Sequence, residues 1–270
     1  MGSVVIAERT IQYHAVDGPA ARGGQRVLYV HGTGCNSEVW IPHMKAIADA
    51  HAPVAIDLPG HGGSAGRGFR GIADYAYFVV ELARTLGWDR FVMVGHSMGG
   101  AIALLTALHH PERLDGLVIV DTGARLRVNP ALLRGAREAA TAALTPATDR
   151  SWAYAGGTPQ SVVDAVQKLT AATDPWVTYG DWIADDTFDV MSRLKDIRVP
   201  TLIVCGAEDR LTPVKYHELL AAQISGSRLT IIEGAGHWVF WEQPETFTQT
   251  VRAFLDSLPP SSARAEPSKP

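Results

Sequence analysis

Residues 95–99 read Gly95-His96-Ser97-Met98-Gly99, a G-x-S-x-G pentapeptide. The apolar run 91–94 precedes it and the small, helix-prone run 100–108 follows it, so the serine lies between a predicted strand and a predicted helix. The glycines two positions before and after the serine have no Cβ atom and therefore permit a tight turn. We expect Ser97 at the tip of a strained bend beside a helix N-terminus, which makes it a candidate nucleophile for acyl transfer.

Strands are predicted on both sides of this turn wherever apolar and β-branched residues run together without alternation, as in parallel sheets covered on both faces. These runs are 27–30, 54–56, 91–94, 117–120, 201–204 and 229–232. Helical patterns occur near 72–86, 98–109, 213–223 and 244–257. Together with a more polar edge hairpin over 3–8 and 10–16, they predict an α/β fold with a doubly wound, mostly parallel, eight-stranded sheet.

One segment, residues 123–193, interrupts the alternation. It contains no convincing strand, and its aromatic residues are widely spread: Trp152, Tyr154, Trp176, Tyr179 and Trp182. We interpret it as a helical cap over the C-terminal edge of the sheet, so that residues 1–122 and 194–258 form the core. The tail 259–270 is rich in Pro, Ser and Ala and is predicted to be disordered.

The composition limits the classes of function. The 270 residues are 46% hydrophobic and 19% charged, which is typical of a globular protein with a substantial core. The formal net charge of -4 offers no basic surface for nucleic acid, and no apolar stretch approaches the ~18 residues that span a bilayer. Cys35 and Cys205 have no metal-binding spacing and are expected to be thiols in a reducing compartment. We therefore expect a cytoplasmic protein without a metal, a nucleic-acid partner or a membrane partner; the sequence does not indicate its oligomeric state.

A serine hydroxyl needs a base to remove its proton, and that base needs a carboxylate to orient it. His237 follows the apolar run that ends at Ile232, so it lies at the edge of the sheet where Ser97 is expected. Asp209 and Asp121 both follow strands and both fit the chain order serine, acid, histidine. We favour Asp209, whose loop could project it toward His237, and expect Asp121 to hydrogen-bond the loop that enters the cap.

The tetrahedral intermediate of acyl transfer needs two hydrogen-bond donors for its oxyanion. The backbone N–H of Met98 is one candidate, and the N–H of Thr33 is the other, with Gly34 in reserve. His31 and His61 resemble candidate catalytic groups but are expected to have structural roles. Candidate substrate-binding residues are the aromatic side chains Trp238, Trp176 and Tyr179.

With these residues in place, the chain resembles the α/β-hydrolase superfamily over nearly all of residues 1–258. Five motifs carry the resemblance: His31-Gly32-Thr33-Gly34, Asp57-Leu58-Pro59-Gly60-His61-Gly62-Gly63-Ser64, Gly95-His96-Ser97-Met98-Gly99-Gly100, Gly206-Ala207-Glu208-Asp209 with Pro213, and Gly234-Ala235-Gly236-His237 with Glu242 and Pro244. The resemblance implies Ser97 as nucleophile, His237 as base and Asp209 as acid, with no cofactor and no metal. A serine nucleophile argues against the dehalogenase and epoxide hydrolase branches, which use aspartate.

The expected activity is therefore that of a serine hydrolase acting on small to medium carboxylic esters through an acyl-enzyme. A lactonase or a carbon–carbon bond hydrolase with the same triad is the alternative. A ligand-binding protein of the same fold is less favoured, because all three triad positions are filled.

Overall fold

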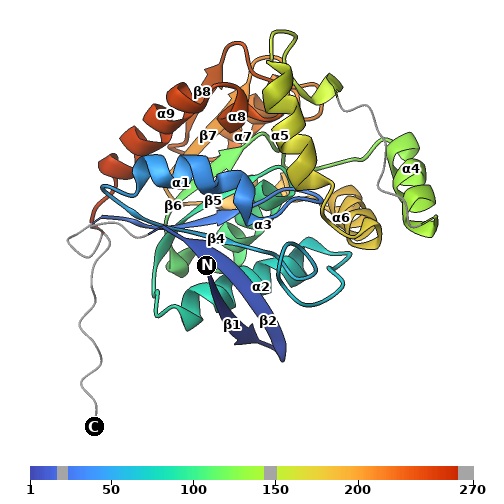
Figure 1. Cartoon of the computed structure of the whole chain (residues 1–270). Coiled ribbons are helices and arrows are strands. Elements are labelled where there is room, and N and C mark those ends of the chain that lie inside the picture. Colours follow the sequence, from blue (N-terminus) through green and yellow to red (C-terminus); the bar gives the residue numbers. More distant parts are fainter. Residues whose placement is uncertain (17–23, 143–150, 261–270) are drawn as a thin grey trace.

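The structure is a computed structural model that describes residues 1–16, 24–142 and 151–260. Its centre is an eight-stranded sheet in the order β1-β2-β4-β3-β5-β6-β7-β8 (Figure 1). The strands are β1 (Gly2–Ile6), β2 (Arg9–Ala15), β3 (Arg26–Val30), β4 (Ala52–Ile56), β5 (Phe91–His96), β6 (Leu114–Val120), β7 (Thr201–Gly206) and β8 (Arg228–Ile232). The β1–β2 and β2–β4 pairs are antiparallel and the others are parallel. This arrangement confirms the predicted sheet and its edge hairpin.

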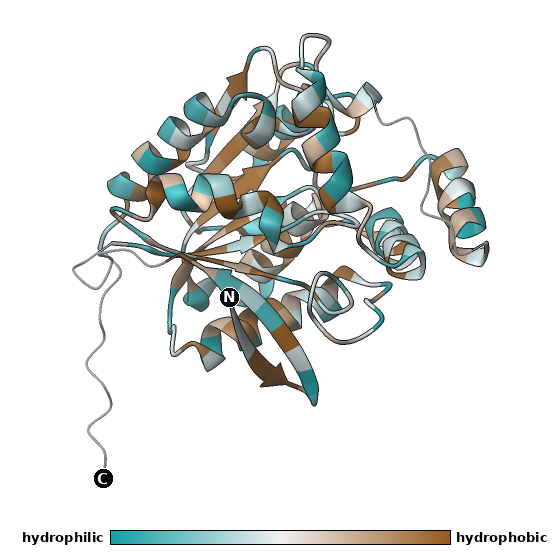
Figure 2. Cartoon of the chain, in the orientation of Figure 1, coloured by the Kyte–Doolittle hydropathy of each residue, from teal (hydrophilic) through white to brown (hydrophobic). Residues whose placement is uncertain are grey.

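Helices cover both faces of the sheet (Figure 1). One face carries α1 (Ile41–Ile47), α8 (Val239–Glu242) and α9 (Pro244–Ser257), and the other carries α2 (Ile72–Thr85), α3 (Met98–His109) and α7 (Val214–Gln223). Strands β5 and β7 are buried along their whole length, so both of their faces take apolar residues. Figure 2 shows these central strands mostly in brown, the hydrophobic end of its scale.

The helices between β6 and β7 are joined by turns and irregular stretches in the described residues. This segment contains α4 (Pro130–Thr141), α5 (Gln160–Thr170) and α6 (Pro175–Thr187), together with short 3-10 turns at Ser151–Ala153 and Met191–Asp196. Helices α4 and α6 begin alike: Asn129 and Asp174 accept a hydrogen bond from the amide two residues later, and a proline follows each of them. We call residues 123–193 the cap segment.

The C-terminal segment leaves the sheet at α9. The backbone oxygen of Pro259 accepts a hydrogen bond from the Gln25 side chain at 2.8 Å, so the start of the predicted disordered tail is attached to the core. The rest of that tail, residues 261–270, lies outside the described residues. Within the described ranges, no helix is long and apolar enough to cross a membrane.

Candidate active site

The turn at Ser97 is as tight as its glycines predict. β5 ends at His96, α3 begins at Met98, and Ser97 has φ 54° and ψ -118°. A Cβ atom on Gly95 would overlap the carbonyl oxygen of Gly99, and one on Gly99 would overlap the carbonyl oxygen of Val30. Larger residues therefore cannot replace these glycines without moving the backbone, which confirms the predicted bend.

The positive φ of Ser97 is unfavourable for a residue with a side chain, and such strain is of order 1–3 kcal/mol. Two hydrogen bonds to the end of β6 hold it: the Ser97 N–H donates to the carbonyl of Val120 at 3.0 Å, and the Thr122 hydroxyl donates to the carbonyl of Ser97 at 2.7 Å. The Ser97 hydroxyl itself has no hydrogen-bond partner among the described residues. Strain of this kind at an unpaired hydroxyl is a reason to expect function.

The loops after β7 and β8 bring an acid to a histidine. The Nδ1 atom of His237 lies 2.8 Å from Oδ2 of Asp209. The Oδ1 atom of Asp209 accepts the amides of Leu211 and Thr212 at 2.8 and 2.9 Å, and the Thr212 hydroxyl donates to Oδ2 at 2.7 Å. Three donors from its own loop thus fix the Asp209 carboxylate toward His237.

The charge of Asp209 follows from these contacts. Burial, the largest influence, raises the pKa of Asp209, but His237 and the hydroxyl and amide of Thr212 together outweigh it and hold the pKa at about 2. The group is therefore a carboxylate at neutral pH and can only accept a hydrogen bond. A neutral His237 must then carry its proton on Nδ1, which leaves Nε2 as the basic nitrogen.

Asp121, the other candidate acid, faces away from this pair. Its Oδ1 accepts the amide of Gly206 at 3.0 Å and its Oδ2 accepts the amide of Val239 at 3.2 Å, so it joins the ends of β6 and β7 to the start of α8. The predicted bond to the loop entering the cap segment is therefore wrong. Burial and the nearby Asp209 raise the pKa of Asp121 well above its usual value.

His237 is also fixed through its backbone. Its N–H donates to the carbonyl of Ala153 in the cap segment at 2.7 Å, and its carbonyl accepts Nε2–H of His96 at 2.8 Å. The His96 ring lies 4.9 Å from the His237 ring and 4.7 Å from the Trp238 ring, measured between centroids. Complete burial lowers the pKa of His96 well below its usual value, so the ring is neutral and packs beneath the turn at Ser97.

The candidate oxyanion donors differ in what they already bind. Residues 32–35 form a β-turn closed by the Cys35 N–H and the Gly32 carbonyl at 3.2 Å, with Gly34 at φ +66°. The Gly34 N–H donates to the Asp181 carboxylate at 2.9 Å, so the reserve donor is engaged. The Thr33 N–H donates to no described residue, and the Met98 N–H, at the first position of α3, has no partner within the helix.

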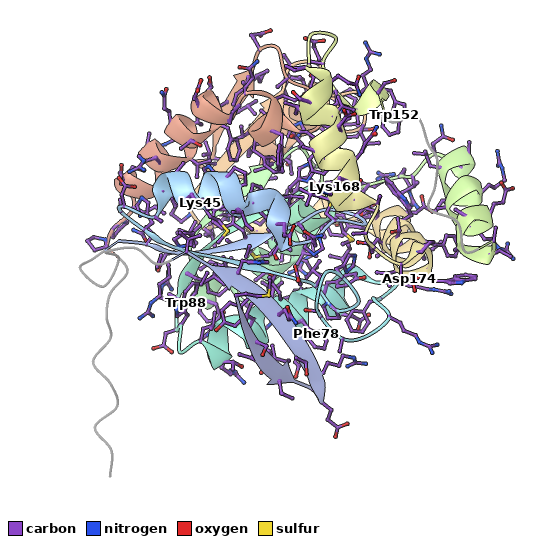
Figure 3. All side chains as sticks on the ribbon, viewed as in Figure 1. Lys45, Phe78, Trp88, Trp152, Lys168 and Asp174 are labelled. Carbon is purple, nitrogen blue, oxygen red and sulfur yellow. The ribbon has the colours of Figure 1, made fainter. Side chains whose placement is uncertain are left out.

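Ser97 borders two cavities. The smaller, about 50 Å³, is also lined by Thr33, His237 and Trp238. The larger, about 510 Å³, is lined mostly by residues of the cap segment, apolar and polar together. Trp152, labelled in Figure 3, and Trp182 line both cavities; the sequence indicates both as aromatic residues of the cap but not as substrate-binding candidates.

The other two predicted substrate-binding residues lie elsewhere. Trp176 is 50% exposed, its ring packs edge-on against Tyr179 at 6.0 Å, and neither residue lines a cavity at Ser97. The helical period explains this, because 176 and 179 share the outer face of α6 whereas 178, 181, 182 and 185 share the inner one. Trp238 alone of the three predicted aromatics borders Ser97.

Other sequence expectations concern metals and thiols. Neither Cys35 nor Cys205 forms a disulfide. Across the described ranges, no group of three or more His, Cys, Asp and Glu side chains is arranged to hold a metal ion.

Comparisons with known proteins agree with this architecture. A sequence model of the family described as "alpha/beta hydrolase fold" matches residues 25–244. A pimeloyl-(acyl-carrier protein) methyl ester esterase of Pectobacterium carotovorum subsp. carotovorum is 30% identical over 248 residues, covering 87% of this chain and 96% of that protein. The solved structure of a thermophilic esterase is 32% identical with a TM-score of 0.77, covering 94% of this chain and 96% of the other. The enol-lactonase of Burkholderia xenovorans LB400 superposes with a TM-score of 0.87 at 22% identity over 95% of this chain and all (100%) of the other, which shows a shared fold.

Proposed function

The chain belongs to the alpha/beta hydrolase fold family, and from that premise we propose that it is a serine hydrolase that cleaves carboxylic esters through an acyl-enzyme intermediate. One observation carries the proposal: Asp209 holds Nδ1 of His237 at 2.8 Å, and His237 and the strained Ser97 border the same cavity. The names of two relatives at 30% and 32% identity, a methyl ester esterase and an esterase, point to the same bond type.

In the proposed reaction, Ser97 attacks the ester carbonyl while Nε2 of His237 takes its proton. His237 then donates that proton to the leaving alcohol, and the acyl group remains on Ser97. A water molecule activated by His237 releases the acid and regenerates the serine. Asp209 keeps the proton of His237 on Nδ1 and stabilises the imidazolium that forms in each half-reaction.

The backbone N–H groups of Thr33 and Met98 are the proposed donors to the oxyanion. Both lie beside Ser97, one in the turn after β3 and the other at the start of α3, and neither is engaged as Gly34 is. Removal of one such donor typically lowers kcat by about 10²- to 10³-fold, so the pair supplies a large part of the rate enhancement.

The larger cavity is the proposed acyl or alcohol site. Its volume of about 510 Å³ lies within the usual range for small-molecule sites, and Trp152, Trp182 and Leu211 offer apolar contact. We therefore propose esters of small to medium size as substrates.

Stopped-flow hydrolysis of p-nitrophenyl esters of graded acyl length tests the proposal. We expect a burst of nitrophenol close to one equivalent of enzyme, labelling of Ser97 by a fluorophosphonate, and loss of both in Ser97→Ala. Equal turnover by the wild-type protein and Ser97→Ala refutes the mechanism. A parallel panel of lactones and vinylogous diketones separates the lactonase and carbon–carbon hydrolase alternatives, and tight ligand binding without labelling indicates a binding protein.

A further inference from the structure

Helix α6 of the cap segment contacts the turn at residues 32–35 through two acidic side chains. The Thr33 hydroxyl donates to Oδ2 of Asp185 at 2.6 Å, and the Gly34 N–H donates to Oδ2 of Asp181 at 2.9 Å. The two acids are four residues apart and therefore lie on one face of the helix, one turn from each other. Both are buried, Asp181 completely. Asp181 thus holds the peptide unit between Thr33 and Gly34, and Asp185 holds the side chain of Thr33.

Asp181 is also bound to the core independently of this turn. Its Oδ2 accepts Nε2–H of His61 at 2.8 Å, and its Oδ1 accepts the hydroxyl of Tyr75 at 2.6 Å. Nδ1 of His61 faces the carbonyl of Pro59 at 3.2 Å, so both ring nitrogens face acceptors, a geometry that favours the protonated ring. Burial, the largest influence, lowers the pKa of His61, but the Asp181 carboxylate and the other acceptors outweigh it and raise the pKa overall. The buried His61–Asp181 pair therefore anchors α6 beside the turn.

Asp185 is the less expected residue. Its Oδ2 accepts the Thr33 hydroxyl, while its Oδ1 is buried without a hydrogen-bond partner among the described residues. Leaving a buried polar atom unpaired costs about 1–3 kcal/mol, and an apolar side chain of similar size would avoid that penalty. Burial raises the pKa of Asp185 well above its usual value. Fold stability alone therefore does not explain the carboxyl group, which contacts Thr33 beside Ser97 and also lines the larger cavity.

The core side of the turn is held by different groups. Nε2 of His31 accepts the N–H of Leu58 at 3.2 Å, and its Nδ1–H donates to the Gly32 carbonyl at 2.9 Å. The beginning of the turn is thereby fixed from the core. Its middle is held from α6 at the Thr33 hydroxyl and the Gly34 N–H, and the Cys35 thiol of the turn itself donates to the Thr33 carbonyl at 3.4 Å. The direction of the Thr33 N–H depends on both halves of the turn.

We propose that Asp181 and Asp185 are positioning residues that hold the turn Gly32–Cys35 so that the Thr33 N–H points at the oxyanion. The inference rests on the proposed function and extends it, because it makes α6 part of the catalytic geometry in addition to a wall of the cavity. The cap segment then contributes to kcat as well as to substrate choice.

A double-mutant cycle between Thr33→Val and Asp185→Leu tests the contact. Each change removes one partner of the same hydrogen bond and keeps the number and branching of the side-chain heavy atoms. Since a misplacement of about 1 Å can lower a rate by about 10²-fold, we expect each single variant to lose roughly 10- to 100-fold in kcat with KM changed less than about threefold. The double variant is expected to lose no more than the worse single variant. Asp185→Asn keeps an oxygen acceptor for Thr33 and is expected to retain kcat within about threefold.

Asp186→Leu is the matched control, because Asp186 lies one position along α6 and accepts the Val128 amide at 3.0 Å instead of a group in the turn. It is expected to retain wild-type kcat. Affinity for a trifluoromethyl ketone, whose adduct with Ser97 carries an oxyanion, should fall in parallel with kcat in Thr33→Val and Asp185→Leu. A purely structural role would lower the unfolding temperature and leave both kcat and this affinity unchanged per folded molecule.

Hydrogen exchange at the amides of residues 32–35 tests the positioning role separately from the proposed ester hydrolysis, because exchange does not depend on turnover. Faster exchange in Asp185→Leu and in Asp181→Leu, with wild-type exchange in Asp186→Leu, supports the contact as a restraint on the turn. Unchanged exchange in both variants, or additive losses of kcat in the cycle, overturns the positioning role. Wild-type protein without Ser97-dependent ester turnover overturns the proposed function, and with it the catalytic part of this inference.

Discussion

Replacement of Asp209 by asparagine changes one atom at the hydrogen bond on which the proposed chemistry depends. The amides of Leu211 and Thr212 both donate to Oδ1, so the asparagine oxygen stays at that position and the –NH2 group takes the place of Oδ2. That –NH2 group then donates to Nδ1 of His237, where the carboxylate accepts. The proton of a neutral His237 moves to Nε2, the nitrogen that must accept the proton of Ser97.

The expected loss in rate is set by the free energy needed to return His237 to the tautomer with its proton on Nδ1. The asparagine side chain offers no charge-assisted acceptor, which forfeits about 1.5–3 kcal/mol, and two donors then face each other, which costs about another 1–3 kcal/mol. The total of roughly 3–6 kcal/mol corresponds to a fall in kcat of about 10²- to 10⁴-fold. The corresponding substitution in a serine protease lowers kcat by about 10⁴-fold, at the upper end of this range.

Asp121→Asn is the matched control, since it makes the same change at the other candidate for the acid. Asp121 serves the Gly206 and Val239 amides, so this variant should lose about 1–3 kcal/mol of unfolding free energy and keep kcat within a few-fold. The assay is steady-state hydrolysis of an activated ester, together with urea unfolding of each variant. If Asp209→Asn retains kcat within tenfold, or if Asp121→Asn loses more than 10³-fold, the assignment of the acid is refuted.

Three further changes probe the turn at Ser97, the buried His43 and the larger cavity. Gly99→Ala places a methyl group on the carbonyl oxygen of Val30 and should lower the unfolding free energy by more than about 2 kcal/mol, measured by urea denaturation; an unchanged value contradicts the close approach. Burial, with a smaller contribution from Arg252, lowers the pKa of His43 to about 3. Below about pH 6.5 the unfolded chain therefore binds a proton at His43 that the folded chain does not bind, and the folded state loses stability. His43→Gln should reduce the loss of unfolding free energy between pH 6.5 and 4.5 by roughly 2–3 kcal/mol; equal losses in the variant and the wild-type protein contradict this role of the ring. Trp182→Ala enlarges the cavity at Ser97 and should shift the ratio of kcat/KM toward longer acyl chains by roughly tenfold; a flat chain-length profile places the acyl group elsewhere.

The sheet and the turn at Ser97 could be predicted because their signals are local. A buried parallel strand is a short apolar run, and the contact of Gly95 with the Gly99 carbonyl requires glycine within the turn itself. The sequence favours Asp209 because its loop could project it toward His237, and the structure adds that three donors from that loop hold the carboxylate. Each of these signals spans only a few residues.

The contacts between α6 and the turn at Thr33 could not be predicted from the sequence in the same way. Its bonds to the turn join residues 147 and 152 positions apart, and an aspartate in a helix usually faces solvent. One signal was present: Val177, Gly180 and Ala184 form a buried stripe at helical spacing, and Asp181 falls within it.

The contacts of the cap segment bear on what can vary in this site. Its Ala153 carbonyl accepts the N–H of His237, and its helix α6 bonds to the turn at Thr33. The proposed base and one proposed oxyanion donor are therefore both held by residues outside the core. A cap that served only to select substrates could be exchanged freely, because its side chains would touch nothing but the ligand. Here an exchanged cap must reproduce a carbonyl at position 153 and a carboxyl one helical turn beyond Asp181. Substrate range is therefore expected to change by substitution at positions such as Trp182, which line the cavity and bond to neither group, before it changes by replacement of the segment.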